Sequence, residues 1–445
     1  MDYVIYFIIT IGILVFVHEF GHFAAAKLTG MRADIFSIGF GKRLFGWNKI
    51  TGLTFGDLPK DFDGQGNTDY RLCLLPLGGY VKIAGMVDES FDTEFADKEP
   101  QPYEFRAKPA WKKIIVISAG VFMNLLLALL IFWGRNFFVP KVIINTTTIG
   151  QIKSNSLADS LGFVSGDKIL AINNKPVSNW EEVFNNIYIS TLGENLDIKI
   201  NHDGEIKDVR VPRKLIPDET KSFLLPKIRP QISKVFSDSP AEKAGIQKND
   251  IFLKLNGVEV NNSRKAIEII SDNKNKLIPV VLLRGKDTLQ LSVTPGSNAK
   301  IGIAIGDGPI LYKNHGFFDS FYYGWKDIVN VTDLTFSTFA KVFQGKVQFG
   351  KVFGGPIKIA QIATTSAENG FSSFLVFLGV LSLSLAIINI MPFPVLDGGH
   401  LIIILVEGAM RREIPIKVKI AIQNTGFVIL LLLMAFIIYN DIINL

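Results

Sequence analysis

The segment His18-Glu19-Phe20-Gly21-His22 brings three side chains suited to metal chemistry close together in the chain. On a helix, residues four apart lie on one face, so the imidazoles of His18 and His22 can both reach one Zn²⁺ ion. Glu19 then lies beside the open coordination position, where a carboxylate can act as a general base. The alternative is a kinked apolar helix with hydrogen-bonded histidines, which would not need Glu19 between two histidines at ligand spacing.

Two histidines leave a catalytic zinc site one protein ligand short, because such sites commonly keep three protein ligands and a water. Asp397 is the candidate for the third ligand. It follows two prolines, which break a helix, and precedes two glycines, which let the backbone approach closely. His400 is the competing ligand. His202 and His315 lie in the segment 141–370, which the charge distribution discussed below predicts to be far from this site.

The segments that must position these side chains are apolar. Of the 445 residues, 48% are hydrophobic and 20% are charged, which fits a membrane part joined to a soluble part. A membrane span needs roughly 20 mostly apolar residues. Four stretches approach this length: Tyr3–Leu28, Ile114–Phe138, Phe371–Met391 and Ile420–Tyr439. A signal peptide is the alternative for the first stretch, but no basic residue precedes its apolar run.

The histidine motif interrupts the first apolar stretch, so ionisable side chains are held at membrane depth. A charged residue at the centre of a span costs about 2.5 to 3.5 kcal/mol, and such residues usually mark a functional path. A transporter or channel is therefore a competing interpretation. Four spans without a repeated membrane half argue against it, because many transporters show such repeats.

Basic residues near the apolar stretches predict the orientation of the chain. The short loop before the fourth stretch contains Arg411, Arg412, Lys417 and Lys419, so we expect it to be cytoplasmic. Both termini and the long segment 141–370 then face outward. The net charge of +6 fits basic cytoplasmic loops, and no concentrated basic face indicates nucleic acid. The single cysteine excludes an internal disulfide.

The outward segment contains an internal repeat with a constant offset of 83 residues. Gly162, Asp167, Asn173 and Val177 recur as Gly245, Asp250, Asn256 and Val260. Each copy combines a short helix, an Asp-containing turn and an alternating strand, a pattern that resembles a PDZ domain. The resemblance implies strand-edge binding of chain ends, and hence substrate selection or size filtering. Two inert spacer domains are the alternative.

Several motifs follow one another along the chain: HEFGH in the first stretch, Ser37–Gly41, Leu75–Lys82, the repeat, and the run from Asn389 to Gly399. With these motifs in this order, the chain resembles the site-2 protease family of intramembrane zinc metalloproteases, in its bacterial branch that regulates sigma-E. The resemblance covers nearly the whole chain. It implies that His18, His22 and Asp397 bind zinc and that Glu19 is the general base.

The resemblance also implies substrate contacts for Asn389. In the second apolar stretch the family pattern Ala-Gly-Pro-x-x-Asn appears with Val121 in place of proline, which puts a backbone kink there in doubt. Asn124 of this pattern is retained, and we predict that it belongs to the substrate-binding residues.

An unwound substrate helix needs partners for its backbone, and the segment from Leu72 to Ile83 is placed by chain order to offer a strand edge. Gly79, Tyr80 and Val81 are the predicted contacts. A peripheral hairpin is the alternative interpretation of this segment.

The predicted fold is a polytopic α-helical membrane protein with four transmembrane helices and two tandem extracytoplasmic PDZ domains. The predicted order is a first transmembrane helix (1–29), a cytoplasmic or membrane-associated loop with the strand edge (30–112), a second helix (113–138), two PDZ domains (145–215 and 228–297), an amphipathic interfacial region (310–370), and two further transmembrane helices (371–400 and 420–440).

The family implies cleavage of membrane-spanning segments in regulated intramembrane proteolysis. The implied substrates are single-span proteins such as an anti-sigma factor after a first cut outside the membrane, or the remnants of signal peptides. A PDZ-bearing membrane adaptor without catalytic activity is the alternative.

Overall fold

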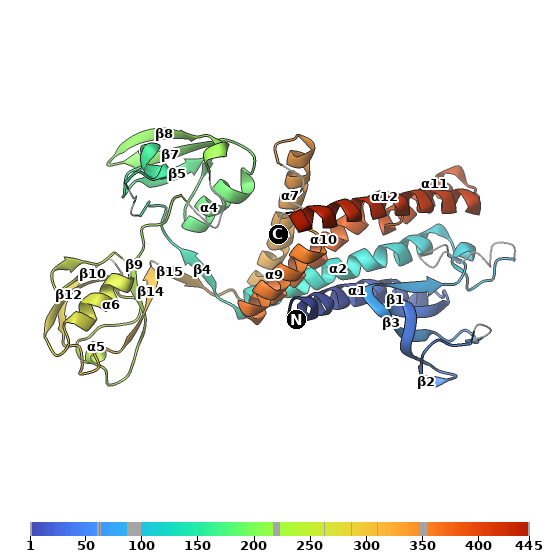
Figure 1. Ribbon diagram of the computed structural model, residues 1–445, viewed down its shortest axis with the longest axis horizontal. Coiled ribbons are helices and arrows are strands. Elements are labelled where there is room, and N and C mark those ends of the chain that lie inside the picture. The colour runs from blue at the N-terminus through green and yellow to red at the C-terminus, as the bar shows by residue number, and fades with distance from the viewer. Residues whose placement is uncertain are drawn as a thin grey trace. The chain divides into compact units, whose positions relative to one another are not determined.

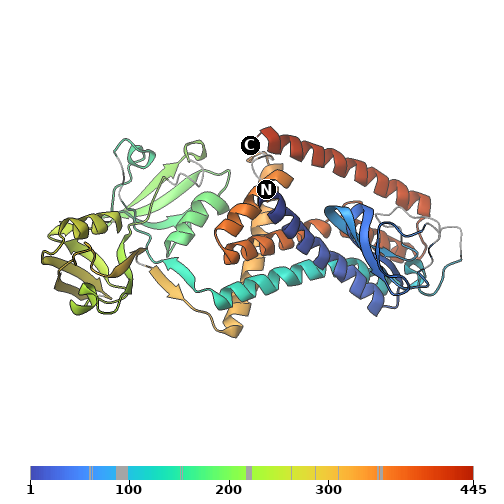
Figure 2. The ribbon, with the colours of Figure 1, turned by 60° about the horizontal axis from the view of Figure 1, so that its bottom comes forward.

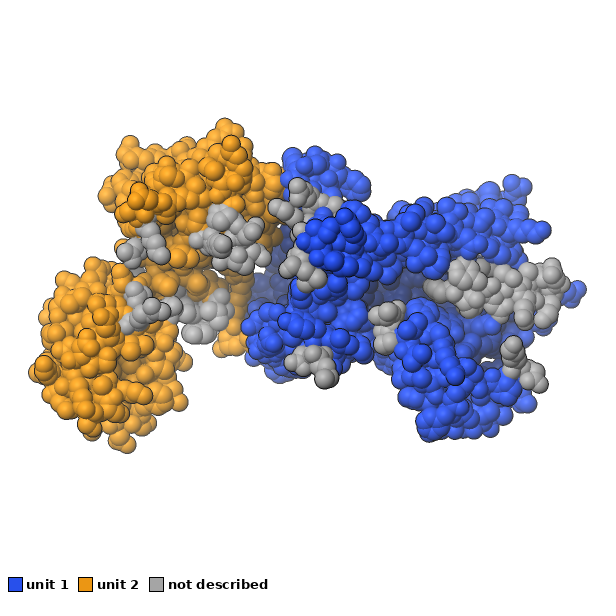
Figure 3. Space-filling view, viewed as in Figure 1, with its two compact units in different colours: residues 1–138, 315–445 blue, residues 139–314 orange. Residues whose placement is uncertain are grey.

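The computed structural model describes residues 2–443 except 60, 61, 63, 87–98, 151, 153, 217–222, 262, 286, 309, 348, 349 and 351–353. The chain divides into two compact units, which Figure 3 colours separately. The first unit is Met1–Phe138 with His315–Leu445, and the second is Val139–Asn314.

Four helices among the described residues are long and apolar enough to cross a membrane. They are α1 (Asp2–Leu28), α2 (Ala110–Phe138), α10 (Phe371–Asn389) and α12 (Ile416–Ile443), and each contains or overlaps one of the four predicted stretches. Even the shortest, α10 with 19 residues, is about 28 Å long at 1.5 Å per residue, close to the thickness of the hydrocarbon core.

Helix α2 is the central helix of the first unit, and it packs against α1, α10, α7 (Phe317–Phe343) and α11 (Asp397–Met410) (Figures 1 and 2). Small residues allow these close contacts: a Cβ at Gly324 of α7 would lie 2.8 Å from the backbone nitrogen of Trp133. Ala128, Phe132, Ile328 and Leu383 form the shared apolar core of α2, α7 and α10.

Helix α9 (Pro356–Glu368) packs against α1 and α10, and the far end of α12 caps it. The buried carboxylate of Asp441 accepts backbone N–H groups of Gly355, Ile357 and Lys358 at 2.9 to 3.3 Å. It therefore satisfies donors that a helix N-terminus leaves without an internal partner. The predicted interfacial region 310–370 thus consists mainly of α7 and α9, and α7 packs on α2 while exposing aromatic side chains such as Phe318 and Tyr322.

A three-stranded sheet lies between α1 and α2 in the sequence, with strands β1 (Ala33–Asn48), β2 (Gly52–Phe55) and β3 (Asp69–Ile83) in the order β2-β1-β3. Val81 of β3 pairs with Phe36 of β1, and both side chains join a buried cluster with residues of α1 and α2. The sheet is therefore packed on α1, the helix that carries the histidine motif, and on α2.

The hairpin of β1 and β2 has the opposite polarity to that of a soluble sheet. Phe45 pairs with Phe55 and Trp47 with Leu53, and all four side chains are exposed. The other face of β1 is buried and polar: the Arg43 guanidinium donates to both carboxylate oxygens of Asp69, at 3.3 and 3.1 Å.

The second unit contains two domains that share the order helix, two strands, helix, two strands, and the second domain has an additional strand at each end. The first has α3 (Leu157–Ser160), β5 (Lys168–Ile172), β6 (Lys175–Pro176), α4 (Trp180–Asn185) with a π-helical turn (Asn186–Ser190), β7 (Leu196–His202) and β8 (Glu205–Val211). The second has β9 (Arg229–Val235), α5 (Pro240–Lys243), β10 (Ile251–Leu255), β11 (Val258–Glu259), α6 (Ser263–Asp272), β12 (Ile278–Arg284), β13 (Asp287–Val293) and β14 (Ile303–Gly308).

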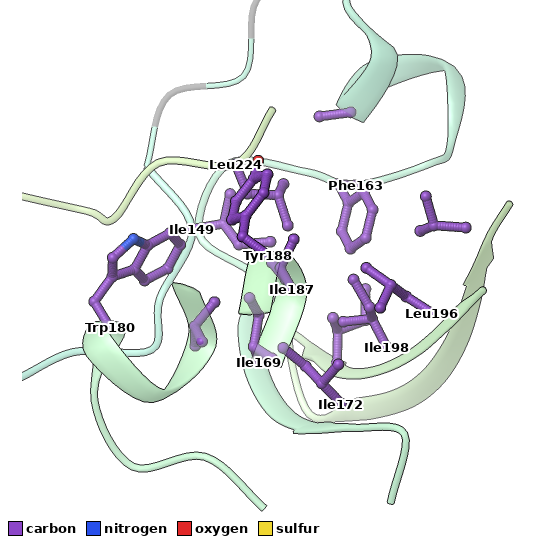
Figure 4. Packing of buried hydrophobic residues seen from close by; sticks show 14 residues of the cluster. Ile149, Phe163, Ile169, Ile172, Trp180, Ile187, Tyr188, Leu196, Ile198 and Leu224 are labelled. Atoms are coloured by element: carbon purple, nitrogen blue, oxygen red, sulfur yellow. The ribbon is translucent and has the colours of Figure 1, made fainter. Parts of the chain in front are cut away.

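In the first domain the strands follow the order β6-β5-β7-β8, and in the second the order is β13-β12-β10-β9-β14 with β11 beside β10. A separate pair is formed by β4 (Lys141–Ile144) and β15 (Ile310–Lys313). Leu196, Ile198 and Ile200 alternate along β7 and point into the core of the first domain, where Phe163 faces them (Figure 4).

The aspartates that revealed the repeat have one structural role in both domains. Asp167 accepts the backbone N–H of Val164 at 2.8 Å and pairs with His202 at the end of β7. Asp250 accepts the N–H of Gln247 at 2.8 Å and pairs with Arg284 at the end of β12. Hydrogen bonds from Arg284 to Asp250 raise the pKa of the guanidinium. Each carboxylate thus ties its turn to a strand end, which explains the matched spacing.

We expect Ile169→Ala, which empties a fully buried position in the first domain, to cost about 2 to 5 kcal/mol of stability. Ile206→Ala on the exposed face of β8 should change stability by less than about 0.5 kcal/mol. Pulse proteolysis of the full chain measures both, because cleavage follows the population of the opened domain. Equal protection of the two variants would contradict the core assignment.

Candidate metal centre

Helix α1 presents His18 and His22 on one face, with their Nε2 atoms 3.2 Å apart. Asp397, the first residue of α11, reaches the same point from the other end of the chain. Its Oδ2 lies 3.3 Å from Nε2 of His18 and 3.5 Å from Nε2 of His22. Three side chains from two distant segments therefore meet with one donor atom each, all within 4.8 Å of one another.

The three donor atoms fit a tetrahedral zinc ion. With zinc–ligand distances of 2.0 to 2.2 Å, the ligand atoms of a tetrahedral site lie about 3.3 to 3.6 Å apart, and the three distances here are 3.2, 3.3 and 3.5 Å. Oδ2 of Asp397 is buried and has no hydrogen-bond partner among the described residues. A buried carboxylate oxygen without a donor needs a cation, and a metal ion at the centre of the triangle satisfies it.

Helix α2 forms the wall behind the two histidines. A Cβ at Gly120 would lie 2.3 Å from His22 Nε2 and 2.6 Å from His18 Cε1, so only glycine leaves room for both rings. A Cβ at Gly21 of α1 would lie 2.4 Å from the carbonyl oxygen of Ala119, so the two backbones approach closely here. The carbonyl oxygen of Val116 accepts the Nδ1–H of His22 at 2.8 Å, which directs Nε2 of that ring toward Asp397.

A tight turn between α10 and α11 positions Asp397. A Cβ at Gly398 would lie 2.2 Å from the carbonyl oxygen of Met391, and one at Gly399 would lie 2.3 Å from that of Phe393. Val395 has a φ of 81°, in the left-handed region that β-branched residues rarely adopt. The predicted third span 371–400 is thus divided, since α10 ends at Asn389 and α11 begins at Asp397.

Two asparagines predicted to bind substrate lie against His18. Nδ2 of Asn389, the last residue of α10, is 3.4 Å from His18 Nε2. Nδ2 of Asn124 on α2 is 3.3 Å from His18 Nδ1. His400, the competing ligand, instead places its Nε2 3.2 Å from Nε2 of Gln423 on α12.

The predicted strand edge lies beside Glu19. A Cβ at Gly79 of β3 would lie 3.1 Å from Cγ of Glu19 and 2.6 Å from the carbonyl oxygen of Ser37. The ring of Tyr80 stacks on Phe40 with centroids 6.1 Å apart, whereas the side chain of Val81 is buried in the sheet core. Strand β3 therefore brings its backbone, more than the side chain of Val81, toward the general-base candidate.

Val116, Gly120 and Gly21 shape the site but were not among the predicted residues. Val116 acts through its carbonyl group, which leaves no side-chain signal in the sequence. Gly120 and Gly21 stood inside motifs whose ionisable or amide residues drew the prediction, and the available signal was the small residue that each motif contains. A bundle of apolar helices that gathers this donor set has the site of a membrane-embedded metallopeptidase.

Comparison with known proteins agrees with this class. The model of peptidase family M50 matches residues 6–433. The chain is 32% identical to a zinc metalloprotease of Vibrio cholerae and 31% identical to the regulator of sigma-E protease RseP of Escherichia coli. Each alignment covers 98% of this chain and 97% of the relative. The chain therefore belongs to peptidase family M50, and it is a metalloprotease of the site-2 type in a bacterial membrane.

Among solved structures, the chain is similar to the PDZ domain of an SdrC-like protein of Listeria monocytogenes, with 18% identity and a TM-score of 0.16. The match covers 17% of this chain and 86% of that domain. The predicted pair of PDZ domains stays a prediction.

We expect Gly120→Ala to weaken zinc binding by about 10-fold or more, since a metal site must be held within about 0.5 Å of its geometry and the new Cβ overlaps both rings. Gly134→Ala is the matched control, because it lies on the same helix and its Cβ would meet nothing within 4 Å. Zinc content per purified chain is the measurement. Equal zinc content in the two variants would remove Gly120 from the site.

Proposed function

We propose that this chain hydrolyses peptide bonds within the membrane-spanning segments of other proteins, with His18, His22 and Asp397 as zinc ligands and Glu19 as the general base. The observation that carries the proposal is the triangle of donor atoms at 3.2, 3.3 and 3.5 Å, formed inside a bundle of apolar helices. No observation favours the alternative of an adaptor without activity, because each residue of the predicted set is present and the three ligand candidates converge.

Each residue then has a distinct task. When bound, zinc supplies Lewis acidity, which activates a water and polarises the substrate carbonyl. Glu19, next to His18 in the chain, accepts the proton of the attacking water and passes it to the leaving amine. The amide of Asn389 faces the same centre and donates a hydrogen bond to the substrate or to the developing oxyanion. Such a donor elsewhere contributes about 2.7 to 4 kcal/mol.

We expect Glu19→Gln to reduce proteolysis about 10²- to 10⁴-fold while zinc stays bound, because the amide cannot accept the proton and the ligands are untouched. Glu368→Gln, at an exposed position near the end of α9, is the matched control and should cleave as the wild type does. Cleavage of a single-span substrate in detergent, with zinc content measured in parallel, checks both. Full activity of Glu19→Gln would exclude its role.

The substrate must unwind before it can be cut, since a helix hides its carbonyl groups in internal hydrogen bonds. We propose that the backbone of β3 at Gly79, Tyr80 and Val81 pairs with the unwound segment. Two observations support this: β3 is the end strand of its sheet among the described residues, and Gly79 lies against Glu19. A strand added there would run past the general base.

We expect Tyr80→Pro or Val81→Pro to lower cleavage about 10-fold, equivalent to roughly 1.4 kcal/mol, because proline cannot donate a backbone hydrogen bond. Leu53→Pro in strand β2, at the opposite end of the sheet, is the matched control. Initial cleavage rates at equal zinc content are compared. Wild-type rates in both β3 variants would sink the strand-edge proposal.

We propose that α1, α2, α10 and α12 all span the bilayer, with both termini and the second unit on the outer side of the inner membrane. The basic loop before α12 supports this orientation. The exposed aromatic face of the β1–β2 hairpin, with Lys42 and Lys49 beside it, fits the cytoplasmic lipid interface. The sheet is therefore a membrane-associated part of the predicted segment 30–112.

We further propose that the two domains of the second unit are PDZ domains that select substrates. The second domain has a groove of roughly 660 Å³ along α6 and β14, lined by apolar side chains including Phe236, Ile267 and Ile303. A groove between a helix and a strand suits an extended chain end with an apolar last residue. The family resemblance implies the remnant of an anti-sigma factor as one such substrate, and remnant signal peptides as another class.

A further inference from the structure

The side chain of Asn124 lies where it can act on His18. Asn124 is fully buried on α2, and its amide nitrogen is 3.3 Å from Nδ1 of His18. Its other amide atom, Oδ1, is buried and has no hydrogen-bond partner in the part of the chain that the structure describes. The backbone is fixed separately, because the hydroxyl of Ser382 on α10 donates to the Asn124 carbonyl oxygen at 2.7 Å. The amide is thus held at the rear of His18, on the side away from Asp397.

The two orientations of this amide have different consequences for the ring. If Nδ2 faces His18, the amide donates to Nδ1, and a neutral ring must carry its proton on Nε2. Nε2 is the atom that lies 3.3 Å from Asp397, so a proton there would exclude it from metal binding. If the amide is turned by half a rotation, Oδ1 accepts the Nδ1–H, and the lone pair of Nε2 points at the donor triangle.

In His22 the Nδ1–H also faces an acceptor, and here the partner has only one possible role. Its Nδ1 faces the carbonyl oxygen of Val116 at 2.8 Å, and a carbonyl can only accept. Val116, Gly120 and Asn124 follow each other at intervals of four on α2 and so lie on one face. On this face the carbonyl group of Val116 accepts the hydrogen bond of His22, and the absence of a side chain at Gly120 leaves space for both imidazole rings. The side-chain amide of Asn124 lies beside His18.

We infer that Asn124 is a positioning residue, whose Oδ1 accepts the Nδ1–H of His18 and so holds that ring in the tautomer and orientation that zinc binding needs. The inference rests on the proposed zinc site and gives Asn124 a task distinct from the predicted substrate contact. Its full burial behind His18 supports this task, since a substrate carbonyl would meet the opposite edge of the ring.

The test compares three substitutions in the full-length chain by competition for Zn²⁺ with a chelator. We expect Asn124→Leu to weaken zinc affinity about 10- to 100-fold, the usual effect of removing the partner of a metal-bound histidine. Asn124→Asp keeps an acceptor and should retain the wild-type affinity. Ser382→Ala is the matched control: it removes the buried hydrogen bond to the backbone of the same residue, leaves the amide in place and should also bind zinc as the wild type does.

A second readout separates positioning from general loosening of the fold. With Co²⁺ in place of zinc, Asn124→Leu should shift the visible absorption bands, whereas Asn124→Asp and Ser382→Ala should not. If the leucine variant does not fold, Asn124→Ala replaces it.

Wild-type zinc affinity in the variant without an acceptor, or equal weakening in Asn124→Asp, overturns the inference. A raised KM with unchanged zinc affinity does so too, and would assign Asn124 to the substrate. A wild-type chain that cleaves its substrate without binding zinc would instead overturn the proposed function.

Discussion

The structure depends on the burial of ionisable metal-binding side chains inside a bundle of apolar helices. Two imidazoles and a carboxylate in an apolar helical bundle are costly unless they satisfy one another or a shared cation. Their metal-binding atoms lie 3.2 to 3.5 Å apart. Among the described residues, Oδ2 of Asp397 has no hydrogen-bond partner, so the three side chains do not satisfy one another without a cation. The surrounding helices are arranged so that this cluster can exist, and the chemistry follows from the cation that it requires.

Helix α2 contributes no ligand, yet it determines the geometry of the centre. Its glycine at position 120 admits both rings, and its carbonyl group at Val116 orients one of them. The same helix packs against α7, α10 and α11, so the wall behind the histidines is also the axis of the first unit. The proposed metal site thus lies against a closely packed helix, while β3 approaches Glu19 from a separate sheet.

The sequence predicted the local features of this site well. The spacing of His18 and His22 is a property of one helix, and the prolines and glycines around Asp397 already indicated a broken helix with close backbone contacts. The predicted apolar stretches match α1, α2, α10 and α12 because a run of about 20 apolar residues is typical of a membrane-spanning helix. The internal repeat also has a structural basis, in the paired roles of Asp167 and Asp250.

Features that depend on the meeting of distant segments were not readable. The acceptor at Val116 is a backbone group, and no residue type marks it. The close contact of α7 with α2 requires a glycine at position 324, because the backbone of Trp133 lies against it. The sequence does not show which residue will lie opposite Gly324. The prolines indicated where the preceding helix ends, but α11 was not predicted as a separate helix because the sequence after Asp397 continues the apolar pattern.

The reversed polarity of the β1–β2 hairpin bears on how the protein is made. The hairpin buries Arg43 and exposes Phe45, Trp47 and Phe55, so this part of the sheet gains little from collapse in water. Its aromatic face is stabilised only when lipid covers it. In the proposed membrane arrangement, the hairpin therefore reaches its stable form only after α1 and α2 have entered the bilayer, and the bilayer acts as its folding partner.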